Sequence, residues 1–512
     1  MIGSPTKALA ARRHCGDRGI LLRTADCRLR TVRARYDAAA TTEENRRHWA
    51  NADHLSANAA NNPTVRRILR ARARYEVANN SYARGIVLTL ANDVVGTGPR
   101  LQLLTDNDSA NRTVEQAFVQ WAEAVRLAEK LRTLRMARAE SGEVFALLTA
   151  NPALQTLVKL DLRLIEADQV ATPMEAVDRR PKAEGSPASA RSLQPAASVD
   201  GIVFDAFGNP VEYHLLRGHP GDASAIGPSL LGFDRVPASA MLHYFRTDRP
   251  GQSRGIPEIT PALPLFAQLR RYTLAVIAAA ETAADFAAVL YTDAPANGEA
   301  DPVEPMDLVE LERRMATVLP GGWKLGQVAA EQPATTYGEF KQQILNEIAR
   351  CLNMPFNVAA GNSSGYNYSS GRLDHQTYFK SIRVEQADIE SRVLDRILAA
   401  WLAEARLLGD FSFLAGVESL EHQWFWDGTE HVDPAKEASA QARRLASNTT
   451  TLASEYARQG KDWETELRQR ARELALMKEL GLTSAQAAPQ APAVGDGDDQ
   501  DPGDKEDGRA AA

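Results

Sequence analysis

The feature that most constrains the fold is an alanine-rich apolar run, LAVIAAAETAADFAAVL, which extends from Leu274 to Leu290. A membrane-spanning helix needs about 20 apolar residues, and Glu281 and Asp285 interrupt this shorter run. Their i,i+4 spacing places both acids on one helical face. Such a face is costly in lipid but natural toward water or a polar partner. The run therefore predicts a helix from about 257 to 288 that does not span a membrane and packs closely through its small side chains.

After this helix the pattern changes to strands and then returns to helix. The sequences AAVLYTD and GGWKLGQV indicate strands on either side of a short helix at 306–317. Helical periodicity resumes and stops at Met354, because a residue that precedes proline is disfavoured in the α region. We therefore expect a compact α/β insert of some forty residues, from about 289 to 328, between the helix at 257–288 and the helix that resumes at TYGEFKQQ.

The rest of the chain reads as predominantly helical with a β region, which makes the predicted fold class α+β. Helical patterns cover 43–91 and 110–139, β-branched runs follow Gly142, and a hairpin is expected around 208–210. A long amphipathic helix runs to about Ala405, with Ile382, Ile389, Val393, Ile397 and Trp401 on its apolar stripe. Three further helices are expected after Trp424, with Asp433 and Asp462 as N-caps and Gly460 between the last two.

The two ends differ strongly in charge. Residues 1–35 carry nine Lys and Arg against two Asp, whereas 486–512 is a low-complexity acidic tail. We expect both ends to be disordered, either as solubilising tails or as partner-binding segments. The Pro/Ala/Ser-rich segment 173–200 reads as a long surface loop or linker. Three cysteines provide no disulfide framework and suit a reducing compartment.

One glycine-rich stretch, GNSSGYNYSSGRLDHQTYFKS at 361–381, fits a hydrolase pattern. Its first five residues match the G-x-S-x-G of a nucleophile elbow, and Asp374 and His375 follow in hydrolase order. The elbow requires a strand and then a helix, whereas PFNVAA is at most a short strand and YNYSSGR looks like a turn. Asp374 and His375 are also sequence neighbours, whose side chains diverge by about 100° on a helix, so the aspartate cannot easily orient the histidine. A flexible polar loop is the preferred interpretation, and a serine hydrolase with Ser363 as nucleophile is the alternative.

No cofactor or metal is predicted from the sequence. The nine histidines are scattered without metal-binding spacing, and neither a P-loop nor a strand-linked G-x-G-x-x-G occurs. One helical segment is crowded with arginines, which we expect on a solvated face or in salt bridges between subunits rather than against phosphates: Arg66, Arg67, Arg70, Arg72 and Arg74.

Four segments in consistent order across residues 30–485 carry a family resemblance. They are ARARYEVANNSYARGIVLTLANDVVGTGPRLQ, HYFRTDRPGQSRGIPEITPAL, LNMPFNVAAGNSSGYNYSSGR and VDPAKEASAQARRLASNTTTLASEYARQGKDWE. Together they resemble the portal proteins of tailed phages, lambda family. Each segment alone is weakly diagnostic, and their shared order makes the resemblance specific.

The resemblance implies a structural role and no enzymatic activity. Portal subunits form a ring, usually of twelve, at one vertex of the capsid in the virion, after assembly in the cytoplasm of the bacterial host. The channel of the ring passes double-stranded DNA during packaging and ejection. The ring contacts the major capsid protein and docks the terminase large subunit and the head–tail connector proteins. Energy for translocation comes from the terminase ATPase.

The resemblance also assigns regions to this chain. They are a wing (36–256), a stem helix (257–288), an α/β clip (289–337), a second stem helix (338–352), a tunnel loop (353–372), a long helix returning to the wing (373–429) and a crown (430–485). The basic arm (1–35), the segment 173–200 and the acidic tail (486–512) stand outside the resemblance. In the tunnel loop, the residues expected to face DNA are Asn362, Ser363, Ser364, Asn367, Tyr368, Ser369, Ser370 and Arg372. Glu281 and Asp285 are expected to line the channel and repel DNA.

Two other interpretations compete with this one. The first is the serine hydrolase. The second is a non-viral scaffold whose basic arm binds nucleic acid.

Overall fold

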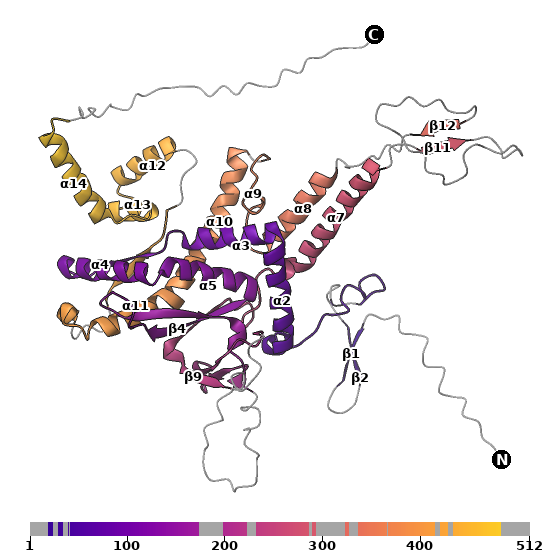
Figure 1. Cartoon of the computed structure of the whole chain (residues 1–512), viewed down its shortest axis with the longest axis horizontal. Coiled ribbons are helices and arrows are strands. Elements are labelled where there is room, and N and C mark those ends of the chain that lie inside the picture. Colours follow the sequence, from indigo (N-terminus) through magenta and orange to yellow (C-terminus); the bar gives the residue numbers. More distant parts are fainter. Residues whose placement is uncertain are drawn as a thin grey trace, which may run out of the picture.

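The computed structural model describes residues 19–23, 29–33, 39, 41–173, 198–222, 232–285, 289–292, 323–326, 336–365, 367–414, 420–428 and 434–482. Across these residues the chain is mainly helical, and small antiparallel sheets pack among the helices (Figure 1). The α+β class with helix predominating is confirmed. No helix in these ranges is both long and apolar enough to cross a membrane.

The basic N-terminal region contains a β-hairpin. Strands β1 (Gly19–Arg23) and β2 (Leu29–Arg33) pair antiparallel, with Ile20 opposite Val32. Branched aliphatic residues favour extended backbone. The expectation of disorder throughout 1–35 is therefore wrong for these two strands.

The first helical pattern is divided by asparagines. A single turn, α1 (Ala57–Ala60), precedes α2 (Pro63–Asn79) and α3 (Ser81–Val95). Asn62 caps α2 by accepting hydrogen bonds from the N–H groups of the second and third helical residues, both at 3.1 Å. Asn80 ends α2 and caps α3 in the same way.

The helix predicted at 110–139 is two helices, α4 (Asp108–Ala124) and α5 (Leu127–Ser141). Between them Arg126 has a φ of 54°, a left-handed conformation that a continuous right-handed helix cannot contain. At the end of α4 the indole of Trp121 donates to the carbonyl of Leu160 at 2.7 Å, which ties this helix to the sheet.

The sheets follow the predicted β region. One has the order β10 (Met241–Phe245), β4 (Glu143–Ala150), β5 (Leu160–Ile165). A second has the order β6 (Ser198–Val199), β7 (Ile202–Phe204), β8 (Pro210–Leu216), β9 (Phe233–Pro237), and its β7–β8 pair confirms the predicted hairpin. A third pairs β13 (His422–Phe425) with β3 (Arg100–Leu103), which joins distant parts of the chain. The central part of linker 173–200, residues 174–197, lies outside the described residues.

Aromatic side chains join these elements in one core. The buried ring of Phe118 lies 5.1 Å from that of Trp121, 5.6 Å from that of Trp401 and 5.7 Å from that of Trp424. These side chains come from α4, α11 (Asp395–Ala405) and β13. The contact explains why the C-terminal part of the long helix packs on the N-terminal helices.

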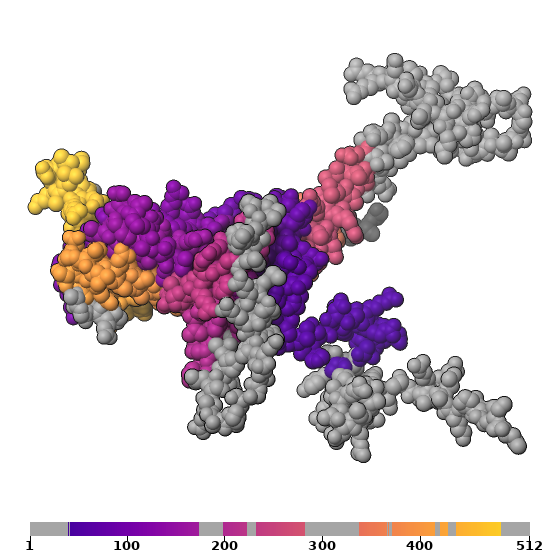
Figure 2. All heavy atoms as spheres, turned by 60° about the horizontal axis from the view of Figure 1, so that its bottom comes forward, coloured from indigo at the N-terminus to yellow at the C-terminus, as the bar shows by residue number. Residues whose placement is uncertain are grey.

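Two helices, α7 (Leu263–Asp285) and α8 (Thr336–Arg350), lie side by side and project from the body as a rod (Figures 1 and 2). The ring of Tyr272 lies 4.6 Å from that of Phe340 within the rod. Helix α7 begins later than the predicted residue 257. The chain carries prolines at 257, 261 and 264, and proline is tolerated only in the first turn of a helix.

Beyond the rod, β11 (Val289–Thr292) pairs antiparallel with β12 (Trp323–Gly326). The two strands predicted on either side of the insert are confirmed. The helix predicted at 306–317 lies outside the described residues.

The long amphipathic helix is confirmed, with one irregularity. It comprises α10 (Tyr368–Ile389), a π-helical segment (Glu390–Leu394) and α11. Each of the five predicted stripe residues is buried: Ile382, Ile389, Val393, Ile397 and Trp401.

The C-terminal region folds as α12 (Pro434–Ala446), α13 (Leu452–Arg458) and α14 (Trp463–Glu479). Asp462 caps α14 through its carboxylate, and Gly460 has a φ of 71° between the last two helices, as predicted. Asp433 and the acidic tail lie outside the described residues.

Candidate nucleic-acid interface

The segment predicted as the tunnel loop, 353–372, contains helix as well as loop. PFNVAA, expected to be at most a short strand, forms the short helix α9 (Phe356–Ala360). Pro355 occupies the N-cap with φ −64° and ψ 149°, a conformation that proline's ring favours and that suits helix entry. The loop itself is 361–367, and α10 follows directly.

Four of the eight residues predicted to face DNA lie in the loop, and all four are exposed: Asn362, Ser363, Ser364 and Asn367. The other four lie in the first turns of α10, which corrects the expected loop boundary: Tyr368, Ser369, Ser370 and Arg372. The helix starts there because the carbonyl of Asn367 accepts the N–H of Gly371 at 3.0 Å. Arg372 is exposed, whereas the side chains of residues 368–370 lie outside the described residues.

Backbone turns give the loop its shape. Gly361 ends α9 with a φ of 62°, a left-handed conformation that glycine adopts without steric penalty. The N–H of Asn362 donates to the carbonyl of Asn357 at 3.0 Å, and the Asn362 side chain accepts the N–H of Ser364 at 2.9 Å. The latter contact is an Asx turn. The loop is therefore an ordered polar turn between two helices.

The structure brings Ser363 near His375, but with an amide between them. The side-chain N–H₂ of Asn357 lies 3.4 Å from the Ser363 hydroxyl and 3.0 Å from Nε2 of His375. Asp374 is exposed, and no hydrogen bond joins it to His375 among the described residues. The amide thus occupies the ring nitrogen that would have to accept the serine proton. A helix does follow the serine, contrary to expectation, but the segment before it is α9 and not a strand.

The two predicted stem acids lie on α7. Glu281 is exposed and has no ion-pair partner among the described residues. Asp285 is the last residue of α7, and its side chain lies outside the described residues. Their four-residue spacing in a helix places both positions on one face of the rod.

A largely buried ion cluster holds the C-terminal end of α10. We call it the Glu258 cluster; it comprises Arg135, Arg138, Glu258, Glu385 and Asp388. The Glu258 carboxylate accepts from Arg135 at 2.8 Å and from Arg138 at 2.9 Å, and Arg135 also reaches Glu385 at 2.7 Å. Burial alone would raise the pKa of Glu258, but the two guanidinium groups outweigh it and lower this pKa to about 2. The cluster ties α5 and α10 to the segment that leads into α7.

A second buried cluster, the Glu143 cluster, comprises Arg70, Glu143, Asp168, His243 and Arg254. Glu143 accepts from Arg254 at 2.8 Å, from His243 at 2.8 Å and from Arg70. Burial opposes its ionisation, yet chiefly the Arg254 charge holds the pKa of Glu143 well below its usual range. Arg70 is buried within the chain, as is Arg66. The solvated or intersubunit position expected for these two residues is therefore wrong. The sequence did not show this, because the acidic partners of both arginines lie far away along the chain.

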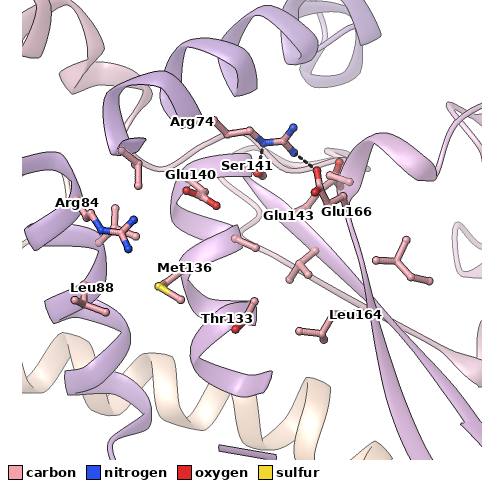
Figure 3. Close-up of a pocket in the computed structure, with 16 residues that line it drawn as sticks. Arg74, Arg84, Leu88, Thr133, Met136, Glu140, Ser141, Glu143, Leu164 and Glu166 are labelled. Atoms are coloured by element: carbon pink, nitrogen blue, oxygen red, sulfur yellow. Dashed lines mark hydrogen bonds and ion pairs between the residues drawn. The ribbon is translucent and has the colours of Figure 1, made fainter. Parts of the chain in front are cut away.

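A cavity of about 510 Å³ lies between α2, α3, α5 and β4 (Figure 3). Most of the residues that line it are apolar. At its rim Arg74 donates to the Ser141 hydroxyl at 3.0 Å and pairs with Glu166 at 3.2 Å. Burial raises the pKa of Glu140, which also lines the cavity.

Near this rim Glu166, Asp168 and His219 lie close enough to share an ion. However, Nδ1 of His219 accepts the N–H of Gly221 at 3.0 Å, which leaves the proton of the neutral ring on Nε2, the nitrogen that faces the carboxylates. Asp168 is already neutralised by Arg70 at 3.0 Å. This chemistry fits an ion-pair cluster rather than a metal centre.

The sequence interpretation missed Asn357 and the two ion clusters. Asn357 is the one polar residue of the short helix α9 and lies two residues after Pro355, which precedes the helix. This isolated amide among apolar residues was the only feature of the sequence that could have indicated a role. The acids and arginines of the clusters are distributed over about 320 positions, from Arg70 to Asp388, so no local spacing reveals them.

Comparison with known proteins agrees with the resemblance. Residues 43–386 match the family model described as phage portal protein, lambda family. A protein of Halomonas phage phiHAP-1 named "Probable portal protein" is 24% identical over 446 residues, which cover 81% of each chain. Solved structures to which the chain is similar include the neck of an empty gene transfer agent particle (TM-score 0.45, 15% identity) and the neck of a native one (TM-score 0.41, 15% identity). Each covers 76% of this chain and 92% of the other.

The family match spans about two thirds of the sequence, including α2 to α5, the rod and the loop 361–367. The chain therefore belongs to the lambda family of phage portal proteins.

Proposed function

We propose that this chain is a structural subunit of a closed ring at one vertex of a capsid, and that double-stranded DNA passes through the ring's channel. Family membership supports the portal role, and the exposed apolar surface of the rod supports assembly. The expected number of subunits is twelve, which comes from the resemblance.

The apolar surface of the rod is the observation that carries this proposal. Leu274 and Ile277 of α7 are 58% and 47% exposed, and Phe340 of α8 is 44% exposed. A projecting two-helix rod cannot bury these side chains against its own body (Figure 2). Leu274 and Ile277 lie three residues apart and so share one face of α7. Exposed apolar surface of this kind marks an interaction site, and neighbouring copies in a ring supply a partner on each side of every rod.

The proposed regions follow the elements. The body up to β10 is the wing, α7 and α8 are the stem, and the β11–β12 insert is the clip. The helices α12 to α14 are the crown, and α10 with α11 leads from the loop back to the wing.

The loop 361–367 is proposed to face the DNA. Its exposed amides and hydroxyls can donate weakly to phosphate oxygens without reading bases. A strongly basic channel would retain DNA through counterion release, whereas this loop is uncharged and the chain carries a formal net charge of −7. Glu281 and Asp285 would add repulsion along the stem. Uncharged contact and acidic walls together allow DNA to slide.

The proposed partners follow from this position. The ring contacts the major capsid protein and docks the terminase large subunit and then the head–tail connector proteins. The ring belongs to the virion and assembles in the bacterial cytoplasm.

Cross-linking tests the DNA contact. A photoreactive amino acid at Ser364 should cross-link to DNA in filled particles, while the same group at Val211 of the β8 strand should not. Equal labelling of both positions would count against a DNA-facing loop.

The serine hydrolase remains a testable alternative. Labelling by a fluorophosphonate that disappears in Ser363→Ala would support it. We expect no labelling, because the Asn357 amide blocks the His375 nitrogen.

A further inference from the structure

We propose that Asn357 is the positioning residue of the loop 361–367, and that its amide ties the loop to α10 in both protonation states of His375. The importance of this tie for DNA passage rests on the function proposed above. The tie itself rests on contacts within the chain.

The backbone of Asn357 holds the start of the loop. Its carbonyl accepts the N–H of Asn362 at 3.0 Å and also receives the N–H of Gly361. Gly361 and Gly365 give this loop unusual conformational freedom, and an added side-chain carbon at either position would meet no atom within 4 Å. Packing around these glycines therefore does not restrain the loop, and the hydrogen bonds must do so.

The side chain of Asn357 holds the middle of the loop to α10. It is 8% exposed, and its N–H₂ group contacts both the Ser363 hydroxyl at 3.4 Å and Nε2 of His375 at 3.0 Å. Loop and helix are thus joined through one buried amide. Its oxygen, Oδ1, is also buried and has no hydrogen-bond partner among the described residues.

The unpartnered oxygen gives the amide a second way to bind. When His375 is neutral, Nε2 accepts from the amide N–H₂. When His375 is protonated, Nε2 carries a hydrogen and can no longer accept from the N–H₂ group of Asn357, because both groups are then donors. A half-turn of the amide then presents Oδ1, which can accept from both Nε2–H and the Ser363 hydroxyl. An asparagine can therefore bond to His375 in either protonation state, whereas a leucine at this position could bond to it in neither.

Charged groups lie near His375 on two elements. On α3 (Ser81–Val95), the Asp93 carboxylate accepts the hydroxyl of Tyr378 at 2.7 Å and interacts electrostatically with His375. On α10 itself, Arg372 and Asp374 are exposed and opposite in charge. No acidic or basic residue lies in α9 or in the loop 361–367.

Hydrogen exchange of the backbone amides in the assembled full-length protein tests the proposal. The amides of Asn362 and Ser364 are hydrogen-bonded, so their exchange reports whether the loop keeps its shape. In Asn357→Leu we expect these amides to exchange at least about tenfold faster at both pH 8.0 and pH 5.5, the range over which histidine changes charge. In the unsubstituted protein, protection corrected for intrinsic rates should agree within about twofold between the two pH values.

Two variants separate the polar contact from packing. Asn357→Asp keeps an acceptor for Nε2–H and for Ser363, so it should retain protection within about twofold. Ser364→Ala removes an exposed hydroxyl and should also leave protection unchanged. The proposal is overturned if Asn357→Leu remains protected, if the Asp and Leu variants lose protection alike, or if the unsubstituted loop opens when His375 is protonated.

Packaging assays distinguish this inference from the function on which it rests. A freed loop in Asn357→Leu, together with at least about tenfold less packaged DNA, supports both. A freed loop with normal packaging supports Asn357 as the positioning residue and contradicts the DNA-facing role of the loop.

Discussion

The Glu258 carboxylate is buried between two arginines, and its removal leaves charge without compensation. Glu258→Gln should lower the free energy of unfolding by about 3–5 kcal/mol. Arg217→Ala is the matched control, because Arg217 and Asp234 form an exposed pair at 2.9 Å that contributes at most about 1 kcal/mol. Urea denaturation of both variants measures the difference, and equal losses would contradict the importance of the buried cluster.

The same residue predicts how stability depends on pH. Because the Arg135 and Arg138 charges lower the pKa of Glu258 from 4.5 to about 2, its stabilising effect is fully present above about pH 4.5. The effect is lost as the pH falls toward 2. The difference in unfolding free energy between the unsubstituted protein and Glu258→Gln should therefore shrink on acidification, by on the order of 3 kcal/mol. A constant difference from pH 6 to pH 2.5 would contradict the assignment.

Residue roles were the least predictable part of this chain. Asp462 could be identified as a cap because a cap acts on residues two or three positions away. Glu258 and Asn357 could not, because their partners come from elements that only the tertiary fold brings together. Tyr368 to Arg372 were misplaced because glycine and serine indicate a turn locally, whereas the following helix extends back over them.

Individual elements depend on a few close approaches. Gly460, between α13 and α14, has a φ of 71°, and an added side-chain carbon would lie 2.7 Å from the Trp426 carbonyl oxygen. Gly460→Ala should therefore speed hydrogen exchange throughout α13 and α14. Gly481 has a similar φ of 67°, but an added side-chain carbon there would meet no atom within 4 Å. Gly481→Ala should therefore incur only the backbone penalty of about 1–2 kcal/mol. Indistinguishable exchange in the two variants would show that the contact with residue 426 is unimportant.

The acidic face of α7 makes a prediction for DNA movement. Reversing both charges, with Glu281→Lys and Asp285→Lys, should slow or stall packaging, because added positive charge in the channel retains phosphates. Reversing Glu479, which is exposed at the end of α14 and outside the rod, is the control. An unchanged packaging rate in the double variant would refute the repulsive role of these acids.

Element types were largely predictable because periodicity is a local property. The buried stripe of Ile382 to Trp401 and the strands around the insert followed from spacing alone. The break at Arg126 did not, since the apolar spacing continues through it and the sheet contact of Trp121 is distant in sequence.

At the scale of the whole molecule, the proposed ring places the apolar face of the rod against neighbouring copies. Leu274→Glu with Ile277→Glu places charge on the exposed apolar face of α7, so the oligomer should dissociate to monomers. Val211→Glu alters a valine that is 49% exposed on β8 and should leave the oligomer intact. Light scattering coupled to size exclusion measures both masses, and an unchanged mass in the double variant would show that α7 does not form the interface.

Cryo-electron microscopy of the purified full-length protein tests the central claim most directly. We predict closed rings with a central hole, in which the α7–α8 rods surround the channel and the loop 361–367 faces it. Discrete monomers, or rings that carry this loop on their outer surface, would contradict the account.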